Sequence, residues 1–480
     1  MRRGAILAGM DTYDVIVIGA GAVGENAAAI PAQRGLRVAI VESHLVGGEC
    51  SYWACIPSKT LLNPGRILEF ARSNPATRSA VTGSLEPGSV FRRRDEMVSE
   101  WDDSSQADWV ADNGIELIRG HARLAGERSV AVTGDDGRTK PYRAERAVIV
   151  ATGSEPVSPD IEGIEDITTW TSRDLTGATE VPARLAIVGG GAVGVEMAQA
   201  WAWLGSEVTL IHNSERLLAA EEPFVGEEIA RALRESGVRV VTGADTKRVR
   251  PVEGGAALEV DVAGEIEEIV VDEVAVAAGR RPRTDDLGVE SVGLSPGDPL
   301  EVDDHMLVTG VGGDWLYAVG DVNGRALLTH AGKYQARIAG AHASGVAGAA
   351  VDAIPATPRV IFTNPEVAAV GLTEQQAADA GISVDVVTHD IGAIAAAGTL
   401  GEGYSGTAEL VIDRCGGVVV GATFVGPQVA ELLHSATVAI VGRVPLRRLW
   451  HAVPAFPTFS EVWLRLLESY RDAGWDPYAP

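Results

Sequence analysis

Two segments of the chain repeat one pattern of apolar and glycine-rich positions. In each, a continuous apolar run typical of a buried parallel strand leads directly into a turn that contains three glycines. A helix-compatible stretch and a second apolar run follow. The first copy has its apolar runs at 13–18 and 37–41, and the second copy has them at 185–188 and 207–211. This succession predicts two βαβ units of the dinucleotide-binding type.

The glycines of the first copy have distinct expected tasks. Gly19 makes the tight turn, Gly21 lets a pyrophosphate approach the backbone, and Gly24 allows close packing of helix and strand. The pyrophosphate is expected at the helix N-terminus, where backbone N–H groups are unpaired. Glu42 follows the second strand and is expected to accept hydrogen bonds from ribose hydroxyls. Pro31 predicts a kink or an early end in the helix, which would otherwise extend to about Gly35.

The second copy keeps the whole strand, turn and helix context, which favours a working site over a decayed remnant of one. His212 follows the first glycine of its turn by 23 positions, as Glu42 does in the first copy. It therefore occupies the ribose-reading position of a second dinucleotide site. The residues expected to contact this second nucleotide are Gly189, Gly191, Gly194, His212, Asn213 and Arg216.

Residues 47–59 carry the strongest candidate for redox chemistry. Cys50 and Cys55 are five positions apart, so their thiols can meet if the short loop between them closes. Pro57 favours the first turn of a helix, and Lys59 would lie one helical turn after Cys55. A helix N-terminus and a nearby cation both lower the pKa of a thiol. This pattern favours a redox-active disulfide over two structural cysteines or half of a metal site, for which only Cys415 remains as a further thiol.

Length and composition restrict the class of protein. A chain of 480 residues is too long to fold around a single hydrophobic core, so several domains are expected. The net charge of −26 disfavours nucleic acid and anionic membranes as partners, and no apolar run is long enough to span a bilayer. The first residues do not resemble a secretory signal. We therefore expect a cytoplasmic protein without a metal, and a solvated helix at the arginine-rich residues 92–94.

The order Gly-Gly-x-Cys-x4-Cys-x-Pro-x-Lys in residues 47–59 resembles the active-site segment of the class I pyridine nucleotide–disulfide oxidoreductases. That family includes dihydrolipoamide dehydrogenase, glutathione reductase and mercuric reductase. The resemblance covers nearly the whole chain and implies FAD at the first dinucleotide site and NAD(P)H at the second. NADPH is favoured because His212 sets no acid against a 2′-phosphate. Tyr52 and Trp53 depart from the small or polar residues usual between the cysteines.

The resemblance also implies individual roles. Cys50 would attack the substrate, Cys55 would lie against the flavin, and Lys59 would pair with Glu196 near the flavin. Four further segments match motifs of the family. They are an Ala-Thr-Gly segment, the segment where the chain returns to the FAD domain, a strand that ends in Gly-Asp, and the start of the next helix. The FAD and crossing contacts implied by these motifs are Thr152, Gly153, Gly279, Asp321, His330 and Ala331.

The implied fold class is α/β, with two Rossmann-like dinucleotide-binding domains of the three-layer type and a C-terminal α+β dimerisation domain. The FAD-binding domain is expected to be discontinuous, at 10–160 and 280–350. The NAD(P)H-binding domain is expected at 161–279, and the interface domain of a homodimer at 355–480. Cys415 is expected in a hairpin turn of that last domain, and therefore to be structural.

The C-terminal segment departs from the family. Its usual His-Pro-Thr, followed by a glutamate, supplies an acid/base for the attacking thiol, whereas this chain has Phe456 before Pro-Thr and keeps Glu461. His451 is expected to be a surface or capping residue. The implied function is electron transfer from NAD(P)H through FAD and the Cys50–Cys55 disulfide to a small acceptor, as in dihydrolipoamide dehydrogenase. A quinone reductase is the main alternative. A carboxylase of the coenzyme M oxidoreductase type and a low-turnover redox sensor are less favoured.

Overall fold

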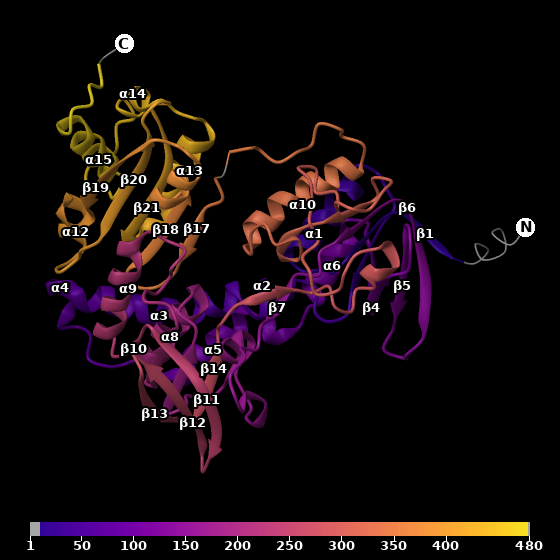
Figure 1. The fold of residues 1–480 in the computed structure, drawn as a ribbon, viewed down its shortest axis with the longest axis horizontal. Coiled ribbons are helices and arrows are strands. Elements are labelled where there is room, and N and C mark those ends of the chain that lie inside the picture. Colours follow the sequence, from indigo (N-terminus) through magenta and orange to yellow (C-terminus); the bar gives the residue numbers. More distant parts are fainter. Residues whose placement is uncertain (1–9, 355, 479–480) are drawn as a thin grey trace, which may run out of the picture. The chain divides into compact units, whose positions relative to one another are not determined.

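The computed structural model describes residues 10–354 and 356–478, and the chain in this range divides into two compact units. The first unit contains residues 10–57, 94–157 and 279–352, and the second contains 58–93, 158–278 and 353–478. Figure 1 labels their helices and strands in chain order. The N-terminal residues considered for a secretory signal, and residue 355 at the predicted start of the interface domain, lie outside the described residues.

A mixed sheet forms the centre of the first unit. Its strand order is β3 (Glu116–Arg119), β2 (Val38–Glu42), β1 (Asp11–Ile18), β6 (Thr139–Val150), β5 (Ser129–Thr133) and β4 (His121–Leu124), and β16 (Leu316–Ala318) also pairs with β6. The pairs that join β3, β2, β1, β6 and β16 are parallel, whereas β5 pairs with β6 and with β4 in the antiparallel sense. The predicted buried runs 13–18 and 37–41 thus lie beside each other at the centre of the sheet.

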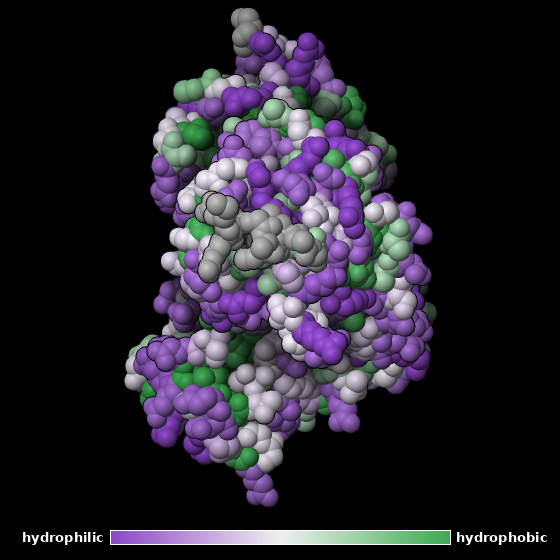
Figure 2. All heavy atoms as spheres, turned by 90° about the vertical axis from the view of Figure 1, so that its right-hand side faces the viewer, coloured by the Kyte–Doolittle hydropathy of each residue, from purple (hydrophilic) through white to green (hydrophobic). Residues whose placement is uncertain are grey.

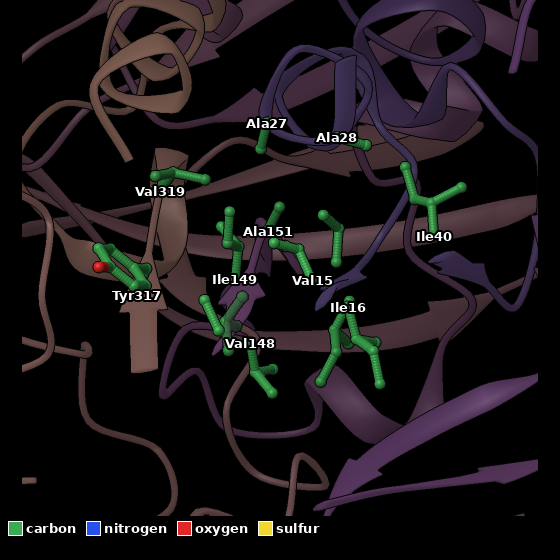
Figure 3. Close-up of a cluster of buried hydrophobic side chains, with 14 of the residues drawn as sticks. Val15, Ile16, Ala27, Ala28, Ile40, Val148, Ile149, Ala151, Tyr317 and Val319 are labelled. Atoms are coloured by element: carbon green, nitrogen blue, oxygen red, sulfur yellow. The ribbon is translucent and has the colours of Figure 1, made fainter. Parts of the chain in front are cut away.

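Helices α1 (Ala22–Gln33) and α10 (Thr329–Ala343) pack together in this unit. Small residues allow this approach, because a Cβ atom on Gly332 would lie 2.6 Å from the Val23 side chain. In Figure 3, Ala27 and Ala28 of α1 lie close to the buried strand residues. The helix ends at Gln33, soon after Pro31 and before Gly35, in agreement with the predicted early end.

Shorter elements complete the first unit. They are α2 (Gly48–Tyr52), η1 (Ser99–Trp101), α6 (Ser104–Asp112), the β7–β15 pair (Ser154–Pro156 and Arg280–Pro282), η3 (Val289–Val292) and η4 (Gly320–Asn323). Two helices have residues in both units, namely α3 (Cys55–Ser73) and α5 (Pro87–Met97).

The second unit contains the other predicted βαβ segment. A parallel sheet has the order β10 (Arg239–Val241), β9 (Glu207–Ile211), β8 (Arg184–Val188) and β14 (Glu273–Val276). The helices of this region are α7 (Ser172–Gly177), α8 (Ala192–Trp203), α9 (Pro223–Glu235) and the short 3₁₀ helix η2 (Ile164–Asp166). An antiparallel sheet of β11 (Ala244–Val252), β12 (Gly255–Val262) and β13 (Glu265–Val271) follows in the chain. Helix α4 (Pro75–Arg78) also belongs to this unit.

The C-terminal part of the second unit is built around an antiparallel sheet. Its strand order is β17 (Arg359–Ile361), β18 (Glu366–Gly371), β21 (Val418–Gly426), β20 (Thr407–Asp413) and β19 (Val384–Asp390). Helices α13 (Val429–Val441) and α15 (Glu461–Asp472) contact this sheet. The remaining helices are α11 (Glu374–Asp379), η5 (Ile391–Ala393), α12 (Ala395–Leu400) and α14 (Leu446–Leu449). Cys415 lies exposed in the turn between β20 and β21, where a hairpin was predicted.

These elements confirm the predicted fold class, with two Rossmann-like dinucleotide-binding folds and a C-terminal α+β domain. One expectation about side chains is wrong. Arg92 and Arg93 are exposed on α5, but Arg94 is fully buried. Its guanidinium lies 5.3 Å from the centre of the Trp101 ring and 2.5 Å from an oxygen of Asp95, which together replace the lost hydration.

Hydrophilic side chains cover much of the face drawn in Figure 2, and hydrophobic ones gather there only in small groups. Within residues 10–354 and 356–478, no helix is long and apolar enough to cross a membrane. The described part of the chain also contains no cluster of three or more His, Cys, Asp or Glu side chains that could hold a metal ion.

Candidate redox and dinucleotide-binding site

The first glycine-rich turn is open for a phosphate group. Gly19 has φ of 99°, and a Cβ atom there would lie 2.5 Å from the backbone oxygen of Ala151. A Cβ atom on Gly24 would lie 1.9 Å from the backbone oxygen of Gly19. Gly21 is the N-cap of α1 and supplies no side-chain cap, so the first N–H groups of the helix face outward without a capping oxygen.

Glu42 is fixed against this turn by backbone hydrogen bonds. The N–H of Ala20 donates to Oε2 of Glu42 at 2.7 Å, and the N–H of His44 donates to Oε1 at 2.8 Å. Each carboxylate oxygen keeps further acceptor capacity. The carboxylate is therefore held at the end of β2, where it can accept hydrogen bonds from the hydroxyls of a ribose.

The two cysteines lie directly beside the first turn. Gly47 forms a β-bridge with Gly21, and a Cβ atom on Gly48 would lie 2.8 Å from the Cα atom of Gly21. Cys50 lies in helix α2, which begins at Gly48, and Cys55 is the first residue of α3. The described cysteines are thiols in this structure.

The two thiols interact with each other. Hydrogen bonding to Cys55, followed by burial, raises the pKa of the Cys50 thiol. Cys55 Sγ also lies 3.4 Å from Oγ1 of Thr329, the first residue of α10. The two thiols therefore lie close enough to interact, and the disulfide between them stays a prediction.

The aromatic residues between the cysteines are held by a second segment of the same unit. The Tyr52 hydroxyl donates to Oε1 of Gln106 at 2.9 Å, and the Trp53 ring lies 5.5 Å from the ring of Trp101. Ser99, Glu100 and Trp101 have φ of 51°, 51° and 60°, which is costly for residues other than glycine. Nothing in the spacing of the sequence could have predicted this strained segment or its contact with Trp53.

Asp321 is held near the β7–β15 pair, where the chain leaves the first unit and later returns to it. The Ser154 hydroxyl donates to Oδ2 of Asp321 at 2.6 Å, and Arg280 Nε donates to the Ser154 oxygen at 2.7 Å. The Thr152 hydroxyl donates to the backbone oxygen of Arg283 at 2.9 Å. Gly153 and Gly279, at the two ends of the crossing, have φ of 72° and 138°.

His330 and Ala331 lie in the first turn of α10, as the sequence predicts. The N-cap position Leu328 offers no side-chain hydrogen bond to this turn. Its backbone N–H groups are therefore available for an electron-rich group.

The second glycine-rich turn repeats the geometry of the first. Gly189 has φ of 125°, and a Cβ atom there would lie 2.3 Å from the backbone oxygen of Ala277. A Cβ atom on Gly194 would lie 1.8 Å from the backbone oxygen of Gly189. Gly191 is the N-cap of α8 and again provides no capping side chain. This turn is consequently shaped for a second pyrophosphate.

His212 occupies the place that Glu42 has in the first unit. The N–H of Gly190 donates to Nδ1 of His212 at 3.2 Å, and burial lowers the pKa of this imidazole. Asn213 is exposed, and Arg216 is half-buried without an ion pair or hydrogen bond within the described residues. Neutral His212 therefore leaves Arg216 as the positively charged member of the predicted nucleotide contacts.

Lys59 and Glu196 form a close ion pair in the second unit. Lys59 Nζ lies 2.8 Å from Oε2 of Glu196, which is 5% exposed. The other oxygen, Oε1, accepts the N–H of Phe362 at 2.9 Å, and the Lys59 ammonium lies 4.8 Å from the centre of the Phe362 ring. Burial, an opposite charge and an aromatic face together fix the position of the ammonium.

The C-terminal segment presents a side chain that carries no proton. Phe456 is 74% exposed, whereas Glu461, at the start of α15, is buried. Arg465 Nη2 lies 2.6 Å from Oε1 of Glu461, and the buried Oε2 has no hydrogen-bond partner in the described part of the chain. His451 is exposed, in agreement with a surface residue. Only the helical spacing of Glu461 and Arg465 could have indicated their contact in advance.

Comparison with known proteins identifies this arrangement. Residues 13–344 match the family described as pyridine nucleotide-disulphide oxidoreductase, and residues 357–466 match its dimerisation domain. The chain belongs to this family. Members of the pyridine nucleotide-disulphide oxidoreductase family are enzymes that use FAD and a pyridine nucleotide, and the two glycine-rich turns of this chain fit such dinucleotides.

Similar proteins of this family carry different activities. A mercuric reductase from Staphylococcus aureus is 32% identical over 94% of this chain and 81% of its own length. A dihydrolipoyl dehydrogenase from Thermus scotoductus is 36% identical over 96% of this chain and 98% of its own length. The Cu(II) complex of the HOCl-induced flavoprotein disulfide reductase RclA from Escherichia coli has 26% identity and a TM-score of 0.83, over 96% of this chain and 99% of that chain.

Proposed function

We propose that this enzyme passes electrons from NADPH through FAD to the Cys50–Cys55 pair and on to a small acceptor. The observation that carries the proposal is the position of the two thiols, which interact directly beside the Gly21 turn. A bound FAD supplies two-electron chemistry between a nicotinamide and a dithiol. Glu42, Asp321 and the N-termini of α1 and α10 would hold that cofactor.

The residues of the chain would place charge around the dithiol. The hydroxyl of Thr329 contacts Cys55 and can stabilise a thiolate there by donating a hydrogen bond. Lys59 would carry a fixed ammonium, oriented by Glu196. Cys50 would be the thiol that exchanges with a substrate, and its contact with Cys55 raises the pKa of its thiol.

A reductase of quinones or of other acceptors that need no protein acid is the second candidate. Phe456 favours it, because phenylalanine offers no general acid or base where the family has a histidine. General acid–base help contributes about 10²–10⁴ in rate, so thiol exchange without it would be slow. A carboxylase of the coenzyme M oxidoreductase type, or a redox sensor with little turnover, has less support.

An acceptor panel under anaerobic conditions tests the proposal. Purified enzyme would be reduced with NADPH or NADH and then offered small disulfides, quinones or metal ions, with the rate of cofactor oxidation as the measurement. We expect turnover with at least one acceptor, with NADPH preferred. Retention of reduced enzyme with every acceptor would support the sensor hypothesis instead.

A homodimer in the cytoplasm completes the proposal. The match to the dimerisation domain supports the homodimer, and a single redox pair supports a reducing compartment. The proposed domain limits are 10–160 with 280–350 for FAD, 161–279 for the nicotinamide nucleotide and 355–480 for the interface. Sedimentation should give the mass of a dimer, and a fully active monomer would contradict this part.

A further inference from the structure

Glu25 is a half-buried acid that has no role in the proposed reaction as described above. It lies in the first turn of α1, directly after the third glycine of the first turn. Its Oε1 atom is inaccessible to water and has no hydrogen-bond partner within the described residues. Burial, opposed by the Lys333 ammonium and reinforced by Glu42, raises the pKa of Glu25 to about 7. This carboxyl therefore changes charge near neutral pH, far above the usual range of a glutamate.

Lys333 connects this acid with the thiol pair. It follows Thr329 by one turn of α10, and residues at this spacing lie on the same helix face. Thr329 contacts Cys55 at 3.4 Å, and α10 packs against α1 through Gly332 and Val23. The Lys333 ammonium lowers the pKa of Glu25 and also that of Cys50. Lys333 has no ion pair or hydrogen bond in the described part of the chain, so its charge is not already neutralised.

We propose that Glu25 and Lys333 are positioning residues that set the fraction of thiolate in the Cys50–Cys55 dithiol. This inference rests on the proposed redox function of that pair. While Glu25 is protonated, the field of Lys333 acts on the thiols and favours thiolate. Once Glu25 ionises, it attracts the ammonium and opposes that field. The pair would therefore adjust thiol protonation in a chain where Phe456 has no proton to give.

Within the described residues, two charged groups are known to act on Glu25, namely Lys333 and Glu42. Glu42 on β2 acts on it directly, and Glu25 in turn raises the pKa of Tyr52 on α2. Tyr52 also faces Asp102, Asp103 and Arg119, and Thr329 faces the thiols. Lys333 is the cation among these groups that acts on both the acid and Cys50.

The test is the pH profile of thiol alkylation in the reduced, FAD-loaded enzyme. Iodoacetamide would be the probe, and mass spectrometry would follow the rate at Cys50 and Cys55 separately. Glu25→Gln should raise the rate at about pH 7 by about three- to tenfold, since a pKa shift of about half to one unit changes the thiolate fraction by that factor. Lys333→Met should lower the rate by a similar factor, and Lys333→Arg should restore it.

The opposite signs distinguish an electrostatic role from a structural one. A purely structural disturbance would move both variants in the same direction, and that result would overturn the inference, as would unchanged profiles. The matched control is Lys140→Met, because this exposed lysine pairs with Asp11 away from the thiols and should leave the rate unchanged.

Titration of the same samples with dithionite separates this inference from the proposed function. Cysteines that take up no electrons in the native enzyme would contradict the redox function itself. Cysteines that take up two electrons, but with an alkylation profile insensitive to Glu25 and Lys333, would contradict only the inference about these two residues. The FAD absorbance of each variant reports whether it is folded. If Glu25→Gln does not fold, the comparison of Lys333→Met with Lys333→Arg still tests the inference.

Discussion

Gly190 donates its backbone N–H to Nδ1 of His212, just as Ala20 donates its own to the carboxylate of Glu42. The two side chains therefore accept hydrogen bonds from equivalent turns, but they offer different groups to a nucleotide, an imidazole in one case and a carboxylate in the other. With Nδ1 accepting, the neutral imidazole carries its proton on Nε2 and offers a single donor. A hydrogen-bond donor suits either a ribose hydroxyl or a 2′-phosphate. The positive charge that would favour the 2′-phosphate must therefore come from Arg216.

The first prediction concerns the choice of nicotinamide nucleotide. His212→Glu should raise the KM for NADPH at least about tenfold more than that for NADH, because it sets a carboxylate against the 2′-phosphate. His212→Gln is the matched neutral control and should change the NADPH to NADH ratio much less. Steady-state KM values for both cofactors are the measurement. Equal effects of the two variants on both nucleotides would mean that this loop does not read the ribose.

The second prediction concerns the thiol pair. In the native enzyme, reductive titration should take up two electrons for the flavin and two for the disulfide. A long-wavelength band between a thiolate and the oxidised flavin should appear midway. Cys55→Ser should abolish the band, whereas Cys50→Ser, which leaves the thiol beside Thr329, should show it without reduction. A band that persists in Cys55→Ser would show that Cys50 is the partner of the flavin.

The third prediction concerns the missing acid. Phe456→His introduces a group that can exchange a proton, and small-disulfide turnover should rise by about tenfold or more, with a pH dependence near the usual histidine pKa of about 6.5. Quinone turnover should stay the same. Phe456→Asn is the control, because it is polar without titrating in this range. If native enzyme already reduces lipoamide faster than any quinone, and Phe456→His alters neither rate, Phe456 does not limit the reaction.

A second acid with a raised pKa lies in the other unit. Glu409 on β20 and Glu222, the N-cap of α9, are both buried and act on each other. Burial and the charge of Glu222 raise the pKa of Glu409 to about 8. Glu222 also accepts the N–H of Glu374 at 2.7 Å through Oε1. The interaction between these two carboxyls thus couples helix α9 to the C-terminal sheet.

The fourth prediction follows from the sign of this shift. A carboxyl whose folded-state pKa is raised contributes stability that is present below its unfolded pKa and lost as pH rises through about 8. The free energy of unfolding should therefore fall between about pH 6 and pH 9. Glu409→Gln should reduce that fall by about 1–3 kcal/mol. Urea denaturation at both pH values is the measurement, and exposed Glu253→Gln is the control. An identical fall in Glu409→Gln and native enzyme would show that the pair does not link pH to stability.

The sequence predicted those features that depend on local pattern. Apolar runs and glycine spacing were enough for both βαβ units, because only glycine fits the contacts at Gly24 and Gly194. The cysteine pair and the position of His212 followed from spacing alone. Arg94 was placed on the surface because its burial depends on Trp101, which reaches it through a left-handed backbone segment. Its neighbours Arg92 and Arg93 are exposed as expected, so the pattern itself could not distinguish the three.

The contacts of Glu25 show the same limit. A carboxylate after the third glycine is visible in the sequence, but Lys333, whose charge lowers the pKa of Glu25, lies on a helix that begins about three hundred positions later. The orphaned Oε1 atom, and with it the raised pKa, appears only once α1 and α10 are packed together.

Strand β16 joins β6 although all of residues 158–278 lie between them in the chain. During synthesis, the sheet around β1 must therefore wait for Leu316–Ala318 to leave the ribosome, while β8, α8 and β9 already have their neighbours. The second βαβ segment, from β8 to β9, can thus fold before the sheet around β1 is complete. Until that moment residues 148–150 of β6 have β1 on one side only, and an unpaired strand edge of this kind in a nascent chain is prone to aggregation.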